Sequence, residues 1–223
     1  MLRAIKRFFR DPDFQPLRSF AQNGEDLMLD RLLEQAGTGF YVDVGAHHPV
    51  RFSNTYLFYR RGWRGINIDA QPGSMRLFRK HRPRDINVEC GVAAKAGTLS
   101  YFRFNEPALN TFDENEARLK DATPYRIVDR VEVGVRPLGE LLAEFLPAGQ
   151  AIDFMSVDVE GLDAEVLGSN DWKRFRPRFL LAETLRTDIL AIASSPTVRL
   201  LGEVGYKPVA KAYNTTFLER IDS

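Results

Sequence analysis

The sequence predicts an α/β fold, in which helices cover both faces of a mostly parallel sheet that ends in an antiparallel hairpin. Two observations lead to this prediction. Short apolar segments alternate with segments of helical periodicity along most of the chain, which is the order of βαβ units. The last two apolar segments, 206–213 and 215–221, are separated by Asn214 alone, which is typical of a hairpin. In such sheets, ligands bind beyond the carboxyl ends of the strands.

The periodicity places each element in chain order. Helices are expected at 22–36, 53–62, 73–81, 138–146 and 195–205. Strands are expected at 40–45, 65–70, 86–93, 98–104, 130–136, 151–159 and 178–184, before the two hairpin strands. The polar segment 105–129 has no regular period, so we expect an irregular, mobile lid there.

Length and charge limit the function classes. The 223 residues fit a basic segment and linker at 1–18 and one folded domain at 19–223. There are 31 basic and 30 acidic residues, so the net charge of +1 gives no reason to expect a nucleic-acid partner. Cys90 is the single cysteine, which favours a reducing, cytoplasmic location.

Basic residues gather in two runs, at 1–10 and 60–84. A charge run is usually a solvated surface. The first run also contains Leu2, Ile5, Phe8 and Phe9, so weak contact with an anionic membrane surface is an alternative there.

The end of the first strand predicts a nucleoside site. Gly45 follows Asp43 there, and a glycine lets a ligand approach the backbone. The G-x-G-x-x-G pattern is missing, which argues against NAD or FAD and favours a smaller nucleoside. Asp69 ends the next strand about 20 residues further on, where an acid binds a ribose diol in nucleotide-binding folds.

A second group of acids follows later strands. Asp158 and Glu160 have the spacing that puts two side chains on one side of a strand, and Glu183 ends the next strand. These carboxylates suggest a divalent metal site or a paired acid and base. Alternatively, Glu160 caps the following helix. His48 is a candidate proton acceptor, although His47 and His48 are equally consistent with a solvated loop.

Four motifs resemble one known family. They are FYVDVGAHHP, SNTYLFYRRGWRGINIDAQP, VDVEGLDAEVLGSNDW and the leading Ser19 with Gln22–Asp26. In this order they resemble the FkbM family of S-adenosylmethionine-dependent methyltransferases, from about residue 19 to the C-terminus. The resemblance implies the class I methyltransferase (Rossmann-like) fold, a seven-stranded sheet with a reversed final hairpin.

The resemblance also implies roles for individual residues. Asp43 and Gly45 would border the methionine part of the cofactor, and Asp69 would hold the ribose hydroxyls. Asp158 would lie at the site of methyl transfer. The remaining expected cofactor contacts are Gln22 and Glu25, together with Cys90, Gly91 and Val92, which would lie near the adenine. Family members usually have Glu-Pro where this chain has Asp69-Ala70, and many have Asn at the position of His47.

By resemblance, the expected activity is O-methylation of a sugar hydroxyl in a cell-surface glycan or a glycosylated metabolite. His48, Asp158 and Glu183 are the expected catalytic residues, and Asp158, Glu160 and Glu183 are candidate ligands for Mg²⁺. Two alternatives stay open: a non-catalytic module that binds S-adenosylmethionine, and a metal-dependent hydrolase built on Asp158, Glu183 and His48.

Overall fold

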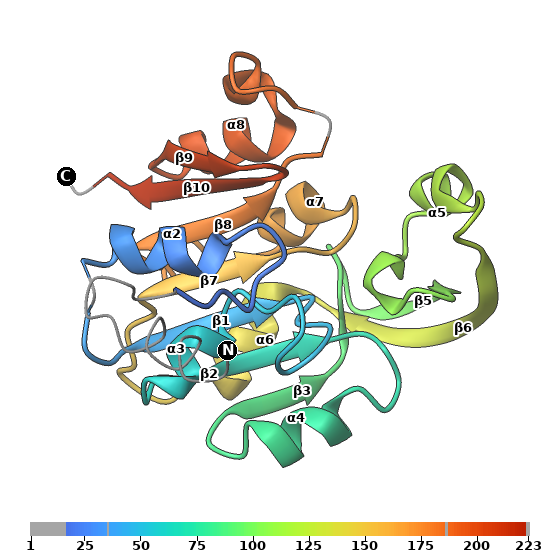
Figure 1. The fold of residues 1–223 in the computed structure, drawn as a ribbon, viewed down its shortest axis with the longest axis horizontal. Coiled ribbons are helices and arrows are strands. Elements are labelled where there is room, and N and C mark those ends of the chain that lie inside the picture. Colours follow the sequence, from blue (N-terminus) through green and yellow to red (C-terminus); the bar gives the residue numbers. More distant parts are fainter. Residues whose placement is uncertain (1–16, 35, 186, 222–223) are drawn as a thin grey trace, which may run out of the picture.

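A seven-stranded sheet forms the centre of the structure, a computed structural model that describes residues 17–34, 36–185 and 187–221 (Figure 1). Its strand order is β3-β2-β1-β7-β8-β10-β9. The first five strands run parallel, whereas β10 is antiparallel to both β8 and β9. The strands are β1 (Phe40–Val44), β2 (Arg64–Asp69), β3 (Ile86–Glu89), β7 (Phe154–Val157), β8 (Phe179–Glu183), β9 (Tyr206–Ala212) and β10 (Thr215–Arg220). This arrangement confirms the predicted class I methyltransferase fold.

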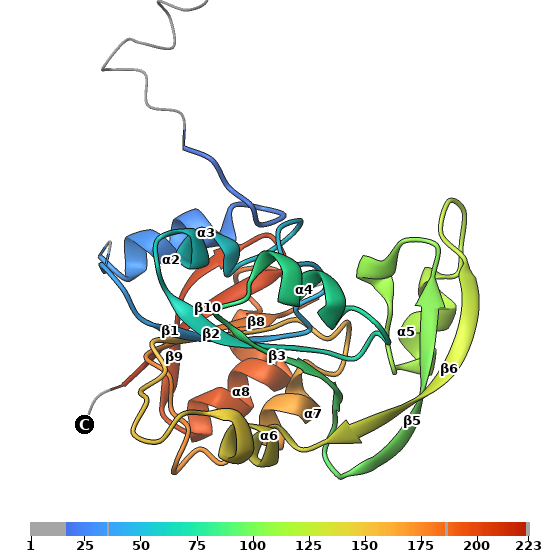
Figure 2. The ribbon, with the colours of Figure 1, turned by 90° about the horizontal axis from the view of Figure 1, so that it is seen from below.

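Helices cover both faces of this sheet, as predicted (Figure 2). On one face α6 (Leu138–Phe145), α7 (Asp163–Gly168) and α8 (Pro196–Glu203) pack on the apolar side chains of the central strands. On the other face lie α2 (Glu25–Leu32), α3 (Tyr56–Arg60) and α4 (Met75–His81). The central strands are buried between these layers, which explains why they read as continuous apolar runs.

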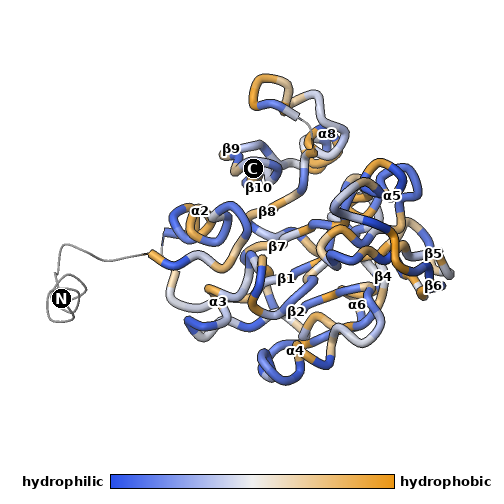
Figure 3. The backbone as a smooth tube through the Cα atoms, turned by 45° about the vertical axis from the view of Figure 1, so that its right-hand side comes forward, coloured by the Kyte–Doolittle hydropathy of each residue, from blue (hydrophilic) through white to orange (hydrophobic). Residues whose placement is uncertain are grey.

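The helices are shorter than their periodicity predicts, because residues at their ends make loop contacts and do not continue the helix. The helix expected at 22–36 begins only at Glu25. The segment before it is held by Asp26, whose carboxylate accepts hydrogen bonds from Ser19 Oγ (2.6 Å) and Phe20 N (2.7 Å). Figure 3 shows hydrophilic and apolar residues alternating along α2 and α4, as expected for helices with one buried side.

Two expectations for the middle of the chain are wrong. The strand expected at 86–93 breaks at Cys90, and β4 (Gly91–Val92) joins a separate three-stranded sheet with β5 (Gly97–Phe104) and β6 (Ile127–Arg136). A Cβ on Gly91 would lie 2.7 Å from both Phe112 and Val135, so this crossing requires glycine.

The segment expected to be irregular at 105–129 contains a short 3₁₀ turn, η1 (Pro107–Leu109), and α5 (Glu114–Lys120). The carboxylate of Asp113 accepts hydrogen bonds from Asn115 N and Glu116 N and caps α5. The basic run at 1–10, for which weak membrane contact is the alternative to a solvated surface, lies outside the described residues.

A fully buried arginine, Arg82, connects the loop between β1 and α3 to the sheet. Its guanidinium donates hydrogen bonds to Pro49 O (2.8 Å), Ser53 Oγ (2.6 Å), Thr55 Oγ1 (2.7 Å) and Asn67 Oδ1 (2.9 Å). Three aromatic rings, those of Tyr56, Tyr59 and Phe78, lie within 5.7 Å of its guanidinium carbon. Arg82 therefore joins α3, α4 and the β1–α3 loop.

Two buried acids, Asp85 and Asp43, have Arg82 as their counter-charge. Asp85 lies 3.9 Å from Arg82 and accepts hydrogen bonds from Tyr41 Oη (2.5 Å) and Asn67 Nδ2 (3.0 Å). Asp43 accepts a hydrogen bond from Thr55 Oγ1 (2.5 Å), which in turn accepts one from Arg82. Burial raises the pKa of Asp43 to about 6, and the charge of Arg82 opposes this rise.

Replacing Arg82 is expected to destabilise the fold strongly. Arg82→Met leaves Asp85 and Asp43 buried without their counter-charge, so the free energy of unfolding should fall by about 3–5 kcal/mol. Urea denaturation measures this loss. Arg79→Met, on the exposed side of α4, is the matched control and should change stability by less than about 0.5 kcal/mol. A loss of similar size in both variants would contradict this role for Arg82.

Candidate functional site

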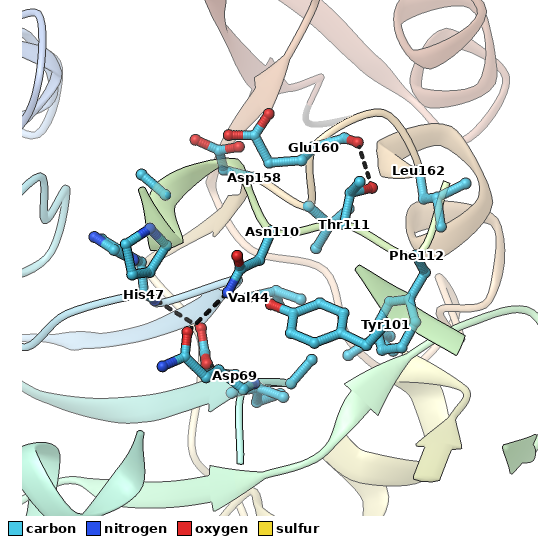
Figure 4. A pocket seen from close by; sticks show the side chains of 18 of the residues that line it. Val44, His47, Asp69, Tyr101, Asn110, Thr111, Phe112, Asp158, Glu160 and Leu162 are labelled. Atoms are coloured by element: carbon cyan, nitrogen blue, oxygen red, sulfur yellow. Dashed lines mark hydrogen bonds between the residues drawn. The ribbon is translucent and has the colours of Figure 1, made fainter. Parts of the chain in front are cut away.

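A pocket lies where β1, β2 and β7 end, at the edge of the sheet predicted to bind ligands (Figure 4). The strand ends Val44, Ile68 and Asp69 form its floor, and Asp158 and Glu160 follow β7 at its wall. Residues 107–112 of the segment between β5 and β6 close another side. The pocket is thus built by the main sheet and the smaller sheet together.

Gly45 allows β1 and β7 to approach each other at the pocket. Its φ is +77°, and a Cβ there would lie 1.8 Å from the carbonyl oxygen of Asp158. The amide of Gly45 donates to Ile68 O (2.9 Å), which fixes the turn against β2. Only glycine satisfies both the left-handed backbone and this close approach.

Asp69 presents a fixed carboxylate to the pocket. One oxygen accepts a hydrogen bond from His47 N (2.8 Å) and the other from Gln71 N (2.9 Å). The side chain is 6% exposed, and its burial raises its pKa, while these two backbone hydrogen bonds oppose the rise. Each carboxylate oxygen keeps further acceptor capacity, as a pair of neighbouring hydroxyl groups would require.

Three of the expected cofactor residues, Asp43, Glu25 and Gly91, do not line the pocket. Asp43 is buried in the network around Arg82. Glu25 is also buried, and its carboxylate accepts hydrogen bonds from Asn23 N (2.7 Å) and Asn23 Nδ2 (3.1 Å). Gln22 does line the pocket, so the leading segment reaches the site through this residue.

The expected adenine side of the pocket is apolar and aromatic. Cys90 and Val92 line it, whereas Gly91 makes room for the ring of Phe112 behind it. Tyr101 of β5 also lines the pocket and packs on Phe112, with ring centroids 4.7 Å apart. Sequence reasoning missed Tyr101 and Phe112, because nothing in the pattern indicates that the smaller sheet returns to the strand ends.

Of the two adjacent histidines, His47 lines the pocket, whereas the prediction placed His48 there. His48, the expected proton acceptor, does not line the pocket, and its Nδ1 accepts hydrogen bonds from Val50 N (3.0 Å) and Arg51 N (2.9 Å). His47 lines the pocket instead, and its Nε2 is buried without a partner. Burial and the charge of Arg51 lower the pKa of His47 to about 4, so this imidazole is neutral at physiological pH.

Side chains of the β5–β6 segment bridge the pocket. Asn110 Nδ2 donates to Gln71 Oε1 (2.8 Å), after β2, and Thr111 Oγ1 donates to Glu160 O (2.9 Å), after β7. Lys120 of α5 forms an ion pair with Glu160. Asn110 and Thr111 are both buried, whereas Tyr125, further along the expected lid, is exposed. The lid therefore contacts the site through residues 107–120.

Backbone strain gathers around the pocket. Five described non-glycine residues have a positive φ, and three of them, His47 (51°), Phe52 (55°) and Glu160 (55°), line this pocket. Each costs of order 1–2 kcal/mol relative to a right-handed backbone. Such residues concentrate at functional sites, where surrounding contacts hold them in place.

The acids after β7 and β8 influence one another's charge. Asp158 is exposed to the pocket, yet the surrounding protein desolvates it, and together with the charge of Glu160 this raises its pKa. Burial and the charges of Asp158 and Glu160 raise the pKa of Glu183 to about 10. Burial raises the pKa of Asp163, at the start of α7, to about 7. Glu183 does not line the pocket, and its Oε2 is buried without a partner.

The acids do not fit a magnesium site. A divalent cation needs several oxygen ligands around one point. In the described part of the chain, no three His, Cys, Asp or Glu side chains come together to hold a metal ion. Glu160 is paired with Lys120, and Glu183 does not line the pocket. The expectation of Mg²⁺ is therefore not supported.

Three comparisons relate this chain to known proteins. The family model for the methyltransferase FkbM domain matches residues 43–207. An O-methyltransferase from Bacillus cereus in complex with SAH has 11% identity and a TM-score of 0.46, over 99% of this chain and 87% of that one. A precorrin-6y C5,15-methyltransferase from Geobacter metallireducens GS-15 has 11% identity and a TM-score of 0.42, over 95% and 93%. A search of curated proteins gives no significant match.

None of the helices within residues 17–34, 36–185 and 187–221 is both long enough and apolar enough to cross a bilayer.

The raised pKa values of two buried acids make the stability of the fold depend on pH. Asp163 and Glu183 have folded pKa values of about 7 and about 10, above the unfolded values of about 4. The folded state therefore binds more protons than the unfolded state in this range, and stability falls as pH rises. The melting temperature should be lower at about pH 8 than at about pH 5.

Glu183→Gln removes the largest contribution to this pH dependence of stability, because the glutamine amide stays neutral at every pH. Its melting temperature should fall less between the two pH values than that of the unmodified protein. Glu203→Gln, an exposed acid of α8, should keep the original dependence. Equal pH dependence in all three proteins would show that Glu183 titrates normally.

Proposed function

Because the chain belongs to the FkbM methyltransferase family, we propose that it transfers a methyl group from S-adenosylmethionine to a hydroxyl group of a sugar. The observation that carries this proposal is the position of Asp69. Its carboxylate ends β2, is fixed by two backbone N–H groups and lines the pocket. An acid at this point of an α/β sheet suits the two hydroxyls of a ribose.

The rest of the pocket suits the other parts of this cofactor. Val92 and the rings of Tyr101 and Phe112 offer an apolar surface to a base. Gly45 leaves the backbone open at the end of β1. The acids after β7 and β8 suit the positive sulfonium and ammonium groups of S-adenosylmethionine. The residues present therefore fit the cofactor.

Bound S-adenosylmethionine supplies a methyl group made electrophilic by the sulfonium charge. Asp158 projects into the pocket and accepts the proton that the acceptor hydroxyl loses. Its raised pKa makes it a stronger base than an ordinary carboxylate. Lys120 keeps Glu160 paired, which limits repulsion between Glu160 and Asp158.

A sugar acceptor is supported by the polar character of the pocket wall. Gln22 and Glu160 offer hydrogen-bonding groups beside Asp158, as a ligand rich in hydroxyls requires. The family resemblance points in the same direction. Family membership favours this activity over a metal-dependent hydrolase, and turnover separates it from a module that binds the cofactor without reaction.

The cofactor half of the proposal is tested by binding. Asp69→Ala removes charge-assisted hydrogen bonds worth about 1.5–3 kcal/mol each, so the Kd for S-adenosylhomocysteine should rise at least about tenfold. Isothermal titration calorimetry measures the Kd. Asp129→Ala, an exposed acid of β6, should bind like the unmodified protein. Unchanged binding by Asp69→Ala would remove the main support for this site.

The transfer half is tested by turnover on a panel of free, nucleotide-linked and lipid-linked sugars. Asp158→Asn cannot accept the hydroxyl proton, so kcat should fall by about 10²–10⁴-fold. Binding of S-adenosylhomocysteine should change much less. Asp171→Asn, in the loop before β8, is the control and should keep kcat. A normal kcat in Asp158→Asn would assign the proton to another group.

A further inference from the structure

The exposed side of α3 and α4 carries positive charge. We define the basic face as the exposed side chains Arg60, Arg76, Arg79, Lys80 and Arg84. Neither helix contains an acid, and Asp69, the one acid between residues 60 and 84, is buried at the pocket. The exposed side of these two helices is therefore positively charged.

The packing of α4 produces this face. Met75, Phe78 and Arg82 occupy its buried side and are at most 2% exposed. Arg76, Arg79 and Lys80 follow the i, i+3, i+4 spacing and so share the opposite, solvent side. Beside them Leu77 is 42% exposed, which places an apolar side chain among the cations.

Arg82 and Arg84 hold α3 and α4 together as one surface. The guanidinium of Arg82 lies against rings of both helices, and Arg84 lies 4.0 Å above the ring of Tyr59 and donates to Tyr59 O (2.6 Å). The cations of the two helices therefore keep fixed positions relative to each other. On the same side, Arg61 is paired with Asp30 of α2 and is not counted in the basic face.

The first described residues, 17–20, lie beside the basic face. The ring of Phe20 packs edge-on against Tyr56 of α3 (4.8 Å), and Arg18 and Arg60 lie over it at 4.9 and 5.6 Å. Leu17, which precedes Arg18, is 80% exposed. The preceding residues 1–10 carry Arg3, Lys6, Arg7 and Arg10 without an acid, together with four large apolar residues.

We propose that the basic face docks the protein on a membrane surface that contains anionic lipids. Clustered Lys and Arg side chains are attracted to such a surface, and exposed apolar side chains among them enter the interface. Each cation held near such a surface adds to the attraction. A nucleic acid would be attracted by the charge alone and would have no use for Leu17, Leu77 or the apolar residues at 1–10.

This docking does not depend on the proposed methyl transfer, because the binding experiment below needs neither cofactor nor acceptor.

The experiment is co-sedimentation of the full chain with vesicles of phosphatidylcholine, with and without phosphatidylglycerol. We expect binding to the anionic vesicles alone, and release of the protein at high salt. The variant Arg76→Ala with Arg79→Ala and Lys80→Ala should bind at least about tenfold more weakly, since each cation near the surface contributes about fivefold.

The matched control replaces three exposed cations of the α8 side, Lys173→Ala, Arg199→Ala and Lys207→Ala, and should bind like the unmodified protein. Thermal melting of both triple variants checks that they are folded. Failure of the unmodified protein to bind, or an equal loss in both triple variants, would overturn the proposal. Binding to a short RNA that is lost in the α4 variant, without vesicle binding, would also overturn it.

Discussion

The buried charge of Arg82 is the interaction on which the site depends most. Its guanidinium lies between the loop after β1 and the sheet, and it compensates two acids, Asp43 and Asp85, that would otherwise be buried without a counter-charge. The same loop presents His47 and Phe52 to the pocket with left-handed backbones. The stability of the core and the shape of the pocket are therefore determined by one hydrogen-bonded network.

The second constraint is the closure of the pocket by the smaller sheet. The main sheet supplies the floor, and without the segment between β5 and β6 the strand ends would face solvent. Asn110 and Thr111 attach this segment to the loops after β2 and β7. Lys120 adds an ion pair with Glu160. These three contacts hold the loops after β2 and β7 against the segment between β5 and β6.

The electrostatics of the site differ between its two sides. At the β2 side, Asp69 is held by backbone N–H groups, as a carboxylate that binds hydroxyls should be. At the β7 and β8 side, burial raises the pKa of Asp158, Glu160 and Glu183, and the charge of Glu160 adds to the rise at Asp158 and Glu183. A cation placed there would lower these pKa values, so the second side is suited to positive charge.

The sequence by itself determined the sheet, its reversed hairpin and the strand ends Gly45, Asp69 and Asp158, because each depends on local periodicity or on the position of a residue at the end of a strand. Only the tertiary structure decided which side chains face the pocket. It placed Asp43 and His48 behind it, replaced His48 by His47 and brought in Tyr101 and Phe112 from the smaller sheet. The physical reason is that burial and partner choice depend on residues far apart in the chain, which no local pattern records.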